Sequence, residues 1–335
     1  MTRGSLSLRT LALLGLGVLA VSLAAPLMAS LAVPALAISF WRTAMGAAAI
    51  APLVGWRVAR GGRPHREASY GDMPMSQEVR EGSPGAPAAT FACRGTGARV
   101  RASEAALVAT AGLCLAAHFG FWVTSLSMTS VASSTAIVSM QVLWVVGYDL
   151  SRGAAVGGRV LAGVLTATVG AVVVGGIDLS ISPRALAGDL FALIGGIAVA
   201  AYAVIGGRAR QRLSTATYTL GCYGTAAAAL LVATLVAGQP LTGYAREDWL
   251  GLLLLTATAQ LLGHTVFNHL LATVSPMVVS LAILLEVPGA SLIAAAWLGQ
   301  VPGPAAFVGL ALMVTGVTVV VLRSPPSPGE EVVPA

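Results

Sequence analysis

Apolar runs of about 20 residues recur along almost the whole chain, and they limit its fold more than any other feature. A helix of this length crosses the hydrocarbon core of a bilayer, where every backbone polar group must be hydrogen-bonded within the protein. The hydropathy pattern predicts ten transmembrane helices, at residues 9–28, 35–56, 104–125, 131–151, 157–177, 185–207, 214–237, 247–271, 275–298 and 302–322. The predicted fold class is all-α, a polytopic membrane protein.

The composition agrees with this class and excludes others. Hydrophobic residues make up 56% of the chain and charged residues 10%, which is far from the balance of a soluble domain. The basic residues are all arginines that cluster between apolar runs and do not interleave with aromatics, so no nucleic-acid partner is expected. Cys93, Cys114 and Cys222 show no metal-ligand spacing and are expected to be unpaired thiols.

The arginines also predict the orientation, because cytoplasmic loops carry the excess of positive charge. With a cytoplasmic N-terminus, only Arg184 and Arg246 lie outside, and all other arginines beyond the spans lie inside. We therefore expect a multi-pass protein of the plasma (inner) membrane with both termini cytoplasmic. Arg3 and Arg9 before the first apolar run would also suit a cleavable signal peptide, but that run is long and the helix count requires it as a span.

An internal repeat divides the chain. The stretch from His118, "HFGFWVTSLSMTSVASSTAIVSMQV", aligns with one from His264, "HTVFNHLLATVSPMVVSLAILLEV", and a later stretch around Gly163 aligns with one around Gly309. The alignment pairs His118 with His264, Phe121 with Phe267, Ser130 with Ser275, Gln141 with Glu286, Gly163 with Gly309 and Gly170 with Gly316. Five helices per copy is an odd number, so the second copy enters the membrane from the opposite side, as in inverted-repeat transporters.

The predicted domains follow from this repeat. Residues 1–177 form the first five-helix repeat, residues 178–323 form the second, and residues 324–335 are a disordered tail. The segment 57–103 inside the first repeat lacks hydrophobic periodicity and is rich in Gly, Pro, Arg and Ser, which predicts a flexible cytoplasmic loop.

Polar residues inside the spans are the candidate site. Gln260, His264 and Asn268 follow each other at four-residue spacing, which places them on one face of an apolar helix. That face must look into the bundle or a wet cavity, together with the repeat-related residues His118 and Trp122 of the third span. The alternative is that these polar groups only bridge helices by hydrogen bonds.

Glu286 lies near the middle of the ninth span, where a charge costs at least about 2.5 kcal/mol on insertion scales. Pro288 removes a backbone donor and frees the carbonyl of Leu284, which a protonated Glu286 would help to satisfy. The functional alternative is a carboxyl group that binds a proton in one state and releases it, or exchanges it for a cationic solute group, in the other. The repeat-related Gln141 is a neutral amide.

Arg42 lies about eight residues into the second span and has no acidic partner in that helix. It suits either an anionic group of a solute or a structural role between helices. Asp149 and Asp189 lie near helix ends and are expected to be structural. His264 and His269 are five residues apart, which turns their rings about 140° from each other on a helix, so no metal site is expected. No cofactor or catalytic residue is expected either.

Several stretches together carry a resemblance to a known family. These are "ISFWRTAMGAA" around Arg42, "TSVASSTAIVSM" opening the fourth span, "ATVSPMVVSLAILLEVPGASLIAAAWLG" in the ninth and the glycines of the closing helix. With ten predicted spans and a matched repeat, the chain resembles the EamA-type branch of the drug/metabolite transporter superfamily. The resemblance implies small-molecule transport without ATP, commonly export, through a central cavity lined by both repeats.

The leading hypothesis is a secondary transporter that moves a small metabolite or drug-like solute by alternating access, and an enzyme is not expected. Coupling of this transport to protons is left open. The expected partners are the solute, protons and the lipid bilayer. The sequence leaves open whether the protein forms a homodimer. A membrane-embedded enzyme is the main alternative, but it would need a concentrated nucleophile, acid–base pair or metal cluster. A transport-inactive scaffold or sensor that uses the arginine-rich loop is the third.

Overall fold

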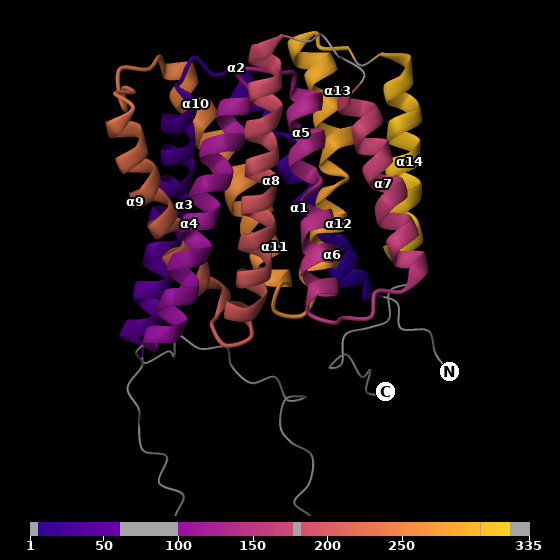
Figure 1. The fold of residues 1–335 in the computed structure, drawn as a ribbon. Coiled ribbons are helices and arrows are strands. Elements are labelled where there is room, and N and C mark those ends of the chain that lie inside the picture. Colours follow the sequence, from indigo (N-terminus) through magenta and orange to yellow (C-terminus); the bar gives the residue numbers. More distant parts are fainter. Residues whose placement is uncertain (1–5, 61–99, 177–181, 302, 322–335) are drawn as a thin grey trace, which may run out of the picture.

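The computed structural model describes residues 6–60, 100–176, 182–301 and 303–321. Most of the predicted loop at 57–103 and the whole tail at 324–335 lie outside these residues. All described elements are helices that stand side by side (Figure 1). They are α1 (Leu8–Ser22), α2 (Ala24–Ser30), α3 (Ala35–Ala59), α4 (Ala102–Ser125), α5 (Val131–Ser139), α6 (Gln141–Ser151), α7 (Gly158–Gly176), α8 (Pro183–Arg210), α9 (Thr215–Val236), α10 (Arg246–Leu255), η2 (Thr256–His264), α11 (Thr265–Leu270), α12 (Pro276–Ile283), α13 (Glu286–Leu298) and α14 (Pro304–Val321).

The helices agree with an all-α membrane protein. Among the described residues, eight helical units are long and apolar enough to cross a membrane, and each coincides with a predicted span. They are residues 8–30, 35–59, 102–125, 131–151, 183–210, 215–236, 246–270 and 276–298. The remaining two predicted spans coincide with the shorter apolar stretches Gly158–Val174 of α7 and Pro304–Val320 of α14.

Serine residues define where several helices begin. Ser130 before α5 accepts a hydrogen bond from the N–H of Ser133, and Ser275 before α12 accepts one from the N–H of Val278. Ser182 and Ser214 cap α8 and α9 in the same way. Such a cap satisfies one of the N–H groups that a helix leaves unpaired at its start. The aligned residues Ser130 and Ser275 are therefore equivalent N-caps in the two halves of the chain.

Two of the membrane-spanning units are broken at aligned positions. The first ends one helix at Ser139 and starts the next at Gln141, and the second ends one at Ile283 and starts the next at Glu286. Pro288 accounts for the second break, where the carbonyl of Leu284 accepts a bond from the N–H of Val287 at 3.3 Å. The first break has no proline inside it. Gln141 and Glu286 are thus each the first residue of a second half-helix.

Two further spans depart from a regular α-helix. The first span changes from α1 to α2 at Leu23, and the eighth contains the π-helical turn η2. Extra π turns occur often at functional sites. Here the carbonyl of Gln260 accepts hydrogen bonds from Tyr223 and Thr265, both at 3.1 Å, which fixes the widened turn.

Helices α7 and α14 form one edge of the bundle, opposite α9 (Figure 1), and their backbones touch through four glycines. A Cβ on Gly170 would lie 2.5 Å from the carbonyl oxygen of Gly309, and one on Gly316 would lie 2.4 Å from that of Gly163. Distances this short leave no room for any side chain. Small residues at a membrane helix crossing allow this close van der Waals packing.

Candidate functional site

A small cavity lies inside the bundle where the two broken spans meet α1, α4, α8 and the eighth span. Its polar lining residues are His118, Trp122, Ser139, Gln141, His264 and Glu286. Its volume of about 20 Å³ is enough for roughly one water molecule, whereas a pocket for a small-molecule ligand measures about 300–1,000 Å³. This cavity is therefore closed to any ordinary solute.

Five of the predicted site residues meet at this cavity. His118 and His264, which the repeat alignment pairs, have ring centroids 6.3 Å apart. Gln141 and Glu286, the other aligned pair, line it from the two helix breaks. Trp122 completes the group and stacks on His118 at 5.3 Å. The cavity is thus built from equivalent positions of the two aligned stretches.

His118 is held in one orientation by α8. Its Nδ1 lies 3.0 Å from the carbonyl oxygen of Gly195. A carbonyl only accepts hydrogen bonds, so Nδ1 carries the hydrogen and Nε2 is left as an acceptor in the neutral ring. Gly195 permits this contact, because a Cβ there would lie 3.2 Å from the Cβ of Trp122.

Buried polar atoms without a partner gather at the cavity. Among the described residues, no hydrogen bond is made by Trp122 Nε1, Ser139 Oγ, Gln141 Oε1 or Glu286 Oε1. Buried polar groups are normally paired, so such a concentration needs an explanation. The Leu284 carbonyl bonds to the N–H of Val287, and among the described residues no hydrogen bond joins it to the Glu286 carboxyl.

Arg42 and Gln260 lie next to each other, separated from the cavity by Phe119. The Nε of Arg42 donates to Gln260 Oε1 at 2.9 Å, and its guanidinium carbon lies 3.8 Å from the centre of the Phe119 ring. The ring of Phe119 also forms a T-shaped contact with that of His264, with centroids 5.2 Å apart. Among the described residues, no carboxylate forms an ion pair with Arg42, whose hydrogen bonds are with Gln260 and Met28.

Asn268 lies elsewhere. Its Oδ1 accepts a hydrogen bond from the Tyr202 hydroxyl, and its Nδ2 donates to Thr219 Oγ1 at 3.3 Å. It does not line the cavity. Of the residues on the predicted polar face, Asn268 is therefore one that bridges helices by hydrogen bonds.

Sequence reasoning missed two residues beside the site. Ser139 precedes the first helix break and lines the cavity, and its signal was a serine and a glutamine two positions apart in an apolar run. Phe119 separates Arg42 from His264, but an aromatic residue beside a histidine in an apolar helix carries no distinguishing signal.

Cysteine labelling tests this division of the polar face. In protein that also samples an open state, His264→Cys is expected to react with a small water-soluble thiol reagent, because its side chain faces the cavity. Asn268→Cys, one turn further, is the matched control and is expected to stay inert. Labelling is followed by intact mass in a background with the native cysteines replaced. Equal labelling of the two positions would contradict the assignment.

Comparisons with known proteins give a matching family model and a solved structure of similar fold. The family model of the EamA-like transporter family matches residues 186–322. A solved structure titled "Crystal structure of protein" has the same fold, with a TM-score of 0.65 and 17% identity, covering 94% of this chain and 96% of that one. A search of the curated proteins gives no match.

Proposed function

Because residues 186–322 are an EamA-like transporter segment of the drug/metabolite transporter superfamily, we propose that this membrane protein is a secondary transporter of a small solute. It works by alternating access between two inverted five-helix repeats, residues 1–177 and 178–323. One observation carries the proposal: two spans break in their middle, and the first residue after each break, Gln141 or Glu286, faces the same closed cavity. Broken helices around a mid-membrane site are typical of transporters built from inverted repeats.

The contacts between the two halves support the inverted repeat. The alignment pairs Gly163 with Gly309 and Gly170 with Gly316, and the close contacts join Gly163 to Gly316 and Gly170 to Gly309. Exchanging the halves maps one contact onto the other. Reciprocal contacts of this kind are what a twofold axis produces, as in a symmetric dimer. The contacts run in antiparallel order along α7 and α14, which is the order expected if one half is turned over relative to the other.

The broken spans supply two closures. Helix α5 packs against α13, and α6 packs against α12. Figure 1 shows the first pair in the upper half of the bundle and the second pair in the lower half. The same exchange of halves maps one pair onto the other. Separating one pair while the other stays packed opens the cavity to one side of the membrane at a time, which is alternating access.

The side chain of Gln300 also belongs to the upper closure. Its Oε1 accepts a hydrogen bond of 3.2 Å from the N–H of Val131 at the start of α5. It thus ties the loop after α13 to the first turn of α5.

Proton coupling is the finer part of the proposal, and Glu286 carries it. The carboxyl group lines the cavity and has an unpaired Oε1, so a proton or a cationic group of the solute has a place to bind. An enzyme is less well supported, because Ser139, the hydroxyl at the cavity, has no hydrogen bond to a base among the described residues.

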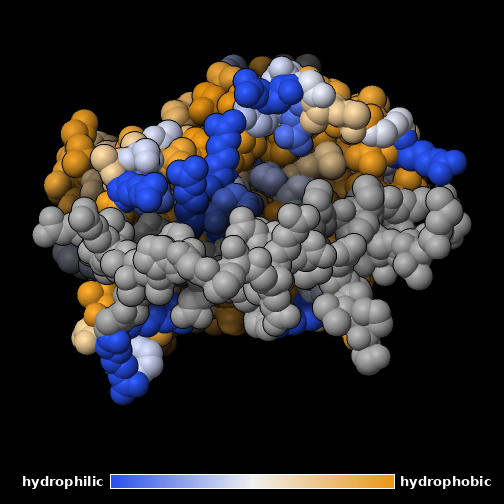
Figure 2. Space-filling view, turned by 90° about the horizontal axis from the view of Figure 1, so that it is seen from below, coloured by the Kyte–Doolittle hydropathy of each residue, from blue (hydrophilic) through white to orange (hydrophobic). Residues whose placement is uncertain are grey.

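For the orientation we propose that the lower end of Figure 1 faces the cytoplasm. Helix α1 begins there and α14 ends there. Figure 2, which looks at this end, shows several groups of hydrophilic residues on it, with hydrophobic residues between and around them. The described arginines at this end are Arg9, Arg57, Arg60, Arg101, Arg152, Arg159, Arg208, Arg210 and Arg212, whereas Arg184 and Arg246 lie at the other.

Reporter fusions test this orientation. A reporter in the segment 57–103 is expected to report the cytoplasm, and one in 238–246 the opposite side, because an odd number of membrane-spanning helices separates the two segments. The same side for both would contradict the inverted arrangement.

Flux measurement tests transport itself. Purified protein is reconstituted into liposomes that contain a pH-sensitive dye, and a panel of metabolites is first screened for compounds that raise the thermal stability. A stabilising compound is expected to move across the membrane down its gradient and, with coupling, to change the internal pH. Bound compounds that never cross would instead favour a sensor, and chemical conversion would favour an enzyme.

A further inference from the structure

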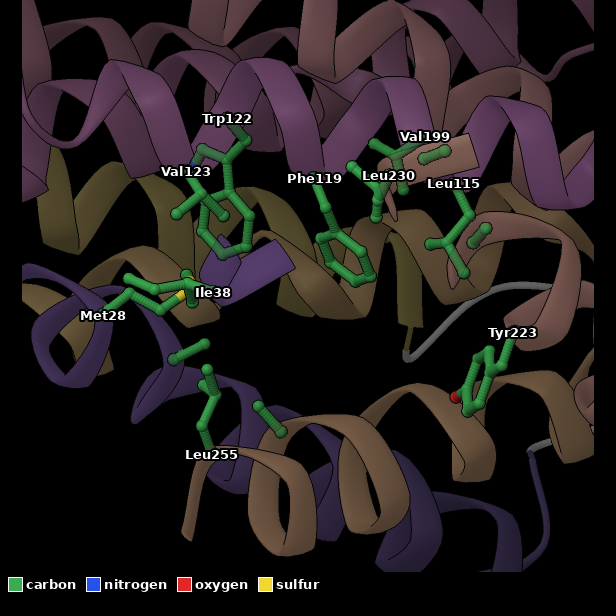
Figure 3. Close-up of a cluster of buried hydrophobic side chains, with 14 of the residues drawn as sticks. Met28, Ile38, Leu115, Phe119, Trp122, Val123, Val199, Tyr223, Leu230 and Leu255 are labelled. Carbon is green, nitrogen blue, oxygen red and sulfur yellow. The ribbon is translucent and has the colours of Figure 1, made fainter. Parts of the chain in front are cut away.

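Arg42 of α3 sits inside an apolar cluster. Its side chain has no exposed surface, and the residues around its head include Met28 and Phe119. Figure 3 shows these two side chains in the cluster of buried hydrophobic residues, with Phe119 projecting from α4. Among the described residues, the guanidinium makes one hydrogen-bond contact besides the Gln260 bond, with the sulfur of Met28 at 3.5 Å from Nη1.

The donors here outnumber the acceptors. A guanidinium has five N–H donors and no acceptor, and the side-chain nitrogen of a glutamine adds two more donors. Arg42 Nη2 and Gln260 Nε2 have no hydrogen-bond partner among the described residues, and both side chains are fully buried. No described carboxylate is within ion-pair distance of Arg42. A buried cation without an anion is strongly unfavourable, so the arrangement calls for a negative group.

We propose that Arg42 Nη2 and Gln260 Nε2 bind a small monovalent anion, either an inorganic ion such as chloride or a carboxylate group. Two N–H donors, one of them charged, match the acceptors of such an anion and offer nothing to a cation. The weakly polar sulfur of Met28 and the ring of Phe119 close the site and keep water away from the charge pair.

The place of this site relative to the cavity suggests its use. Phe119 contacts both Arg42, which lies over its ring, and His264, in a T-shaped arrangement, and Gln260 and His264 both belong to η2. The anion site and the cavity are therefore linked through contacts of one phenylalanine side chain. A carboxylate at Arg42 would then belong to the transported solute, and to that extent the inference rests on the proposed function, whereas binding of the anion alone does not.

Thermal unfolding in different salts tests the site. Purified full-length protein is unfolded in sodium gluconate, whose large anion does not fit, and the gluconate is replaced stepwise by chloride or formate at constant ionic strength. A ligand of the native state raises Tm, and we expect a saturable rise of about 3 °C or more. A response to chloride alone identifies an inorganic ion, and a response to formate identifies a carboxylate.

Variants connect the response to the two residues. Gln260→Glu places an internal carboxylate beside the guanidinium, so Tm in gluconate is expected to rise and the response to added anion to disappear. Arg42→Met removes the cation and should also remove the response. Arg152→Gln, at an exposed arginine, is the control and should keep it.

Two results would overturn the inference. One is an equal Tm of the unaltered protein in gluconate, chloride and formate, which would leave ordered water as the partner of the donors. The other is an undiminished anion response in Gln260→Glu. If Arg42→Met does not fold, Gln260→Glu alone decides. Either negative result leaves the flux measurement unaffected, because that assay covers solutes of every charge.

Discussion

Glu286→Gln is expected to abolish proton-driven uphill transport and to leave the fold intact. Glutamine has nearly the size and shape of the protonated acid but cannot release a proton. It loses no hydrogen bond of Oε1, which has none among the described residues. The chain itself shows that a glutamine fits such a place, because Gln141 begins the equivalent half-helix beside the same cavity. Exchange of solute at equal concentrations is expected to persist, since exchange does not require proton release.

The measurement compares uphill accumulation driven by a pH gradient with solute exchange, in liposomes of equal protein content. Asp189→Asn is the matched control. The Asp189 carboxylate accepts a hydrogen bond of 3.0 Å from Ser133 and does not line the cavity, so coupling should remain. The coupling role is wrong if Glu286→Gln still accumulates solute with an unchanged pH dependence. A purely structural glutamate would instead show a harmless Glu286→Gln and a less stable Glu286→Ala.

Gly170→Leu is expected to cost about 3 kcal/mol of stability or more, at the upper end of what overpacking costs. Even a Cβ at this position would meet the Gly309 carbonyl oxygen at 2.5 Å and the backbone nitrogen of Met313 at 2.7 Å. Neither is a side-chain atom that can rotate away. The two helices must therefore separate, and the contact between the two halves is lost at this edge.

Gly147→Leu is the control for Gly170→Leu, because nothing lies within 4 Å of a Cβ at that position. It makes the same change of residue in another membrane-spanning unit. Thermal unfolding in detergent and the amount of protein recovered from membranes are compared for both. Similar Tm values for the two variants would mean that α7 and α14 do not depend on this crossing.

The positions of the helices could be predicted from the sequence because span length is set by the bilayer. The predicted range 131–151 and the helical unit Val131–Ser151 have the same bounds. The break at Gln141 could not be found, since it has no proline and shows only through its alignment with Glu286. The hydropathy pattern shows only how long an apolar segment is, whereas the break depends on a few backbone hydrogen bonds within that segment.

The site could be predicted only in part, for a related reason. The spacing of Gln260, His264 and Asn268 gives their shared helix face, but what each of them meets depends on other helices. Asn268 meets Tyr202 and Thr219, and His264 meets the cavity. Arg42 was recognised as unusual from its lack of an acidic neighbour, yet its bond to Gln260 joins residues that are 218 positions apart.

The small size of the closed cavity also bears on electrical insulation. A proton crosses a membrane quickly along a continuous file of water molecules, and a space of about 20 Å³ holds roughly one. The packed half-helices on either side interrupt any such file. We therefore expect little proton leakage through the protein in the absence of its solute, so vesicles that contain it should hold a pH gradient as long as empty ones.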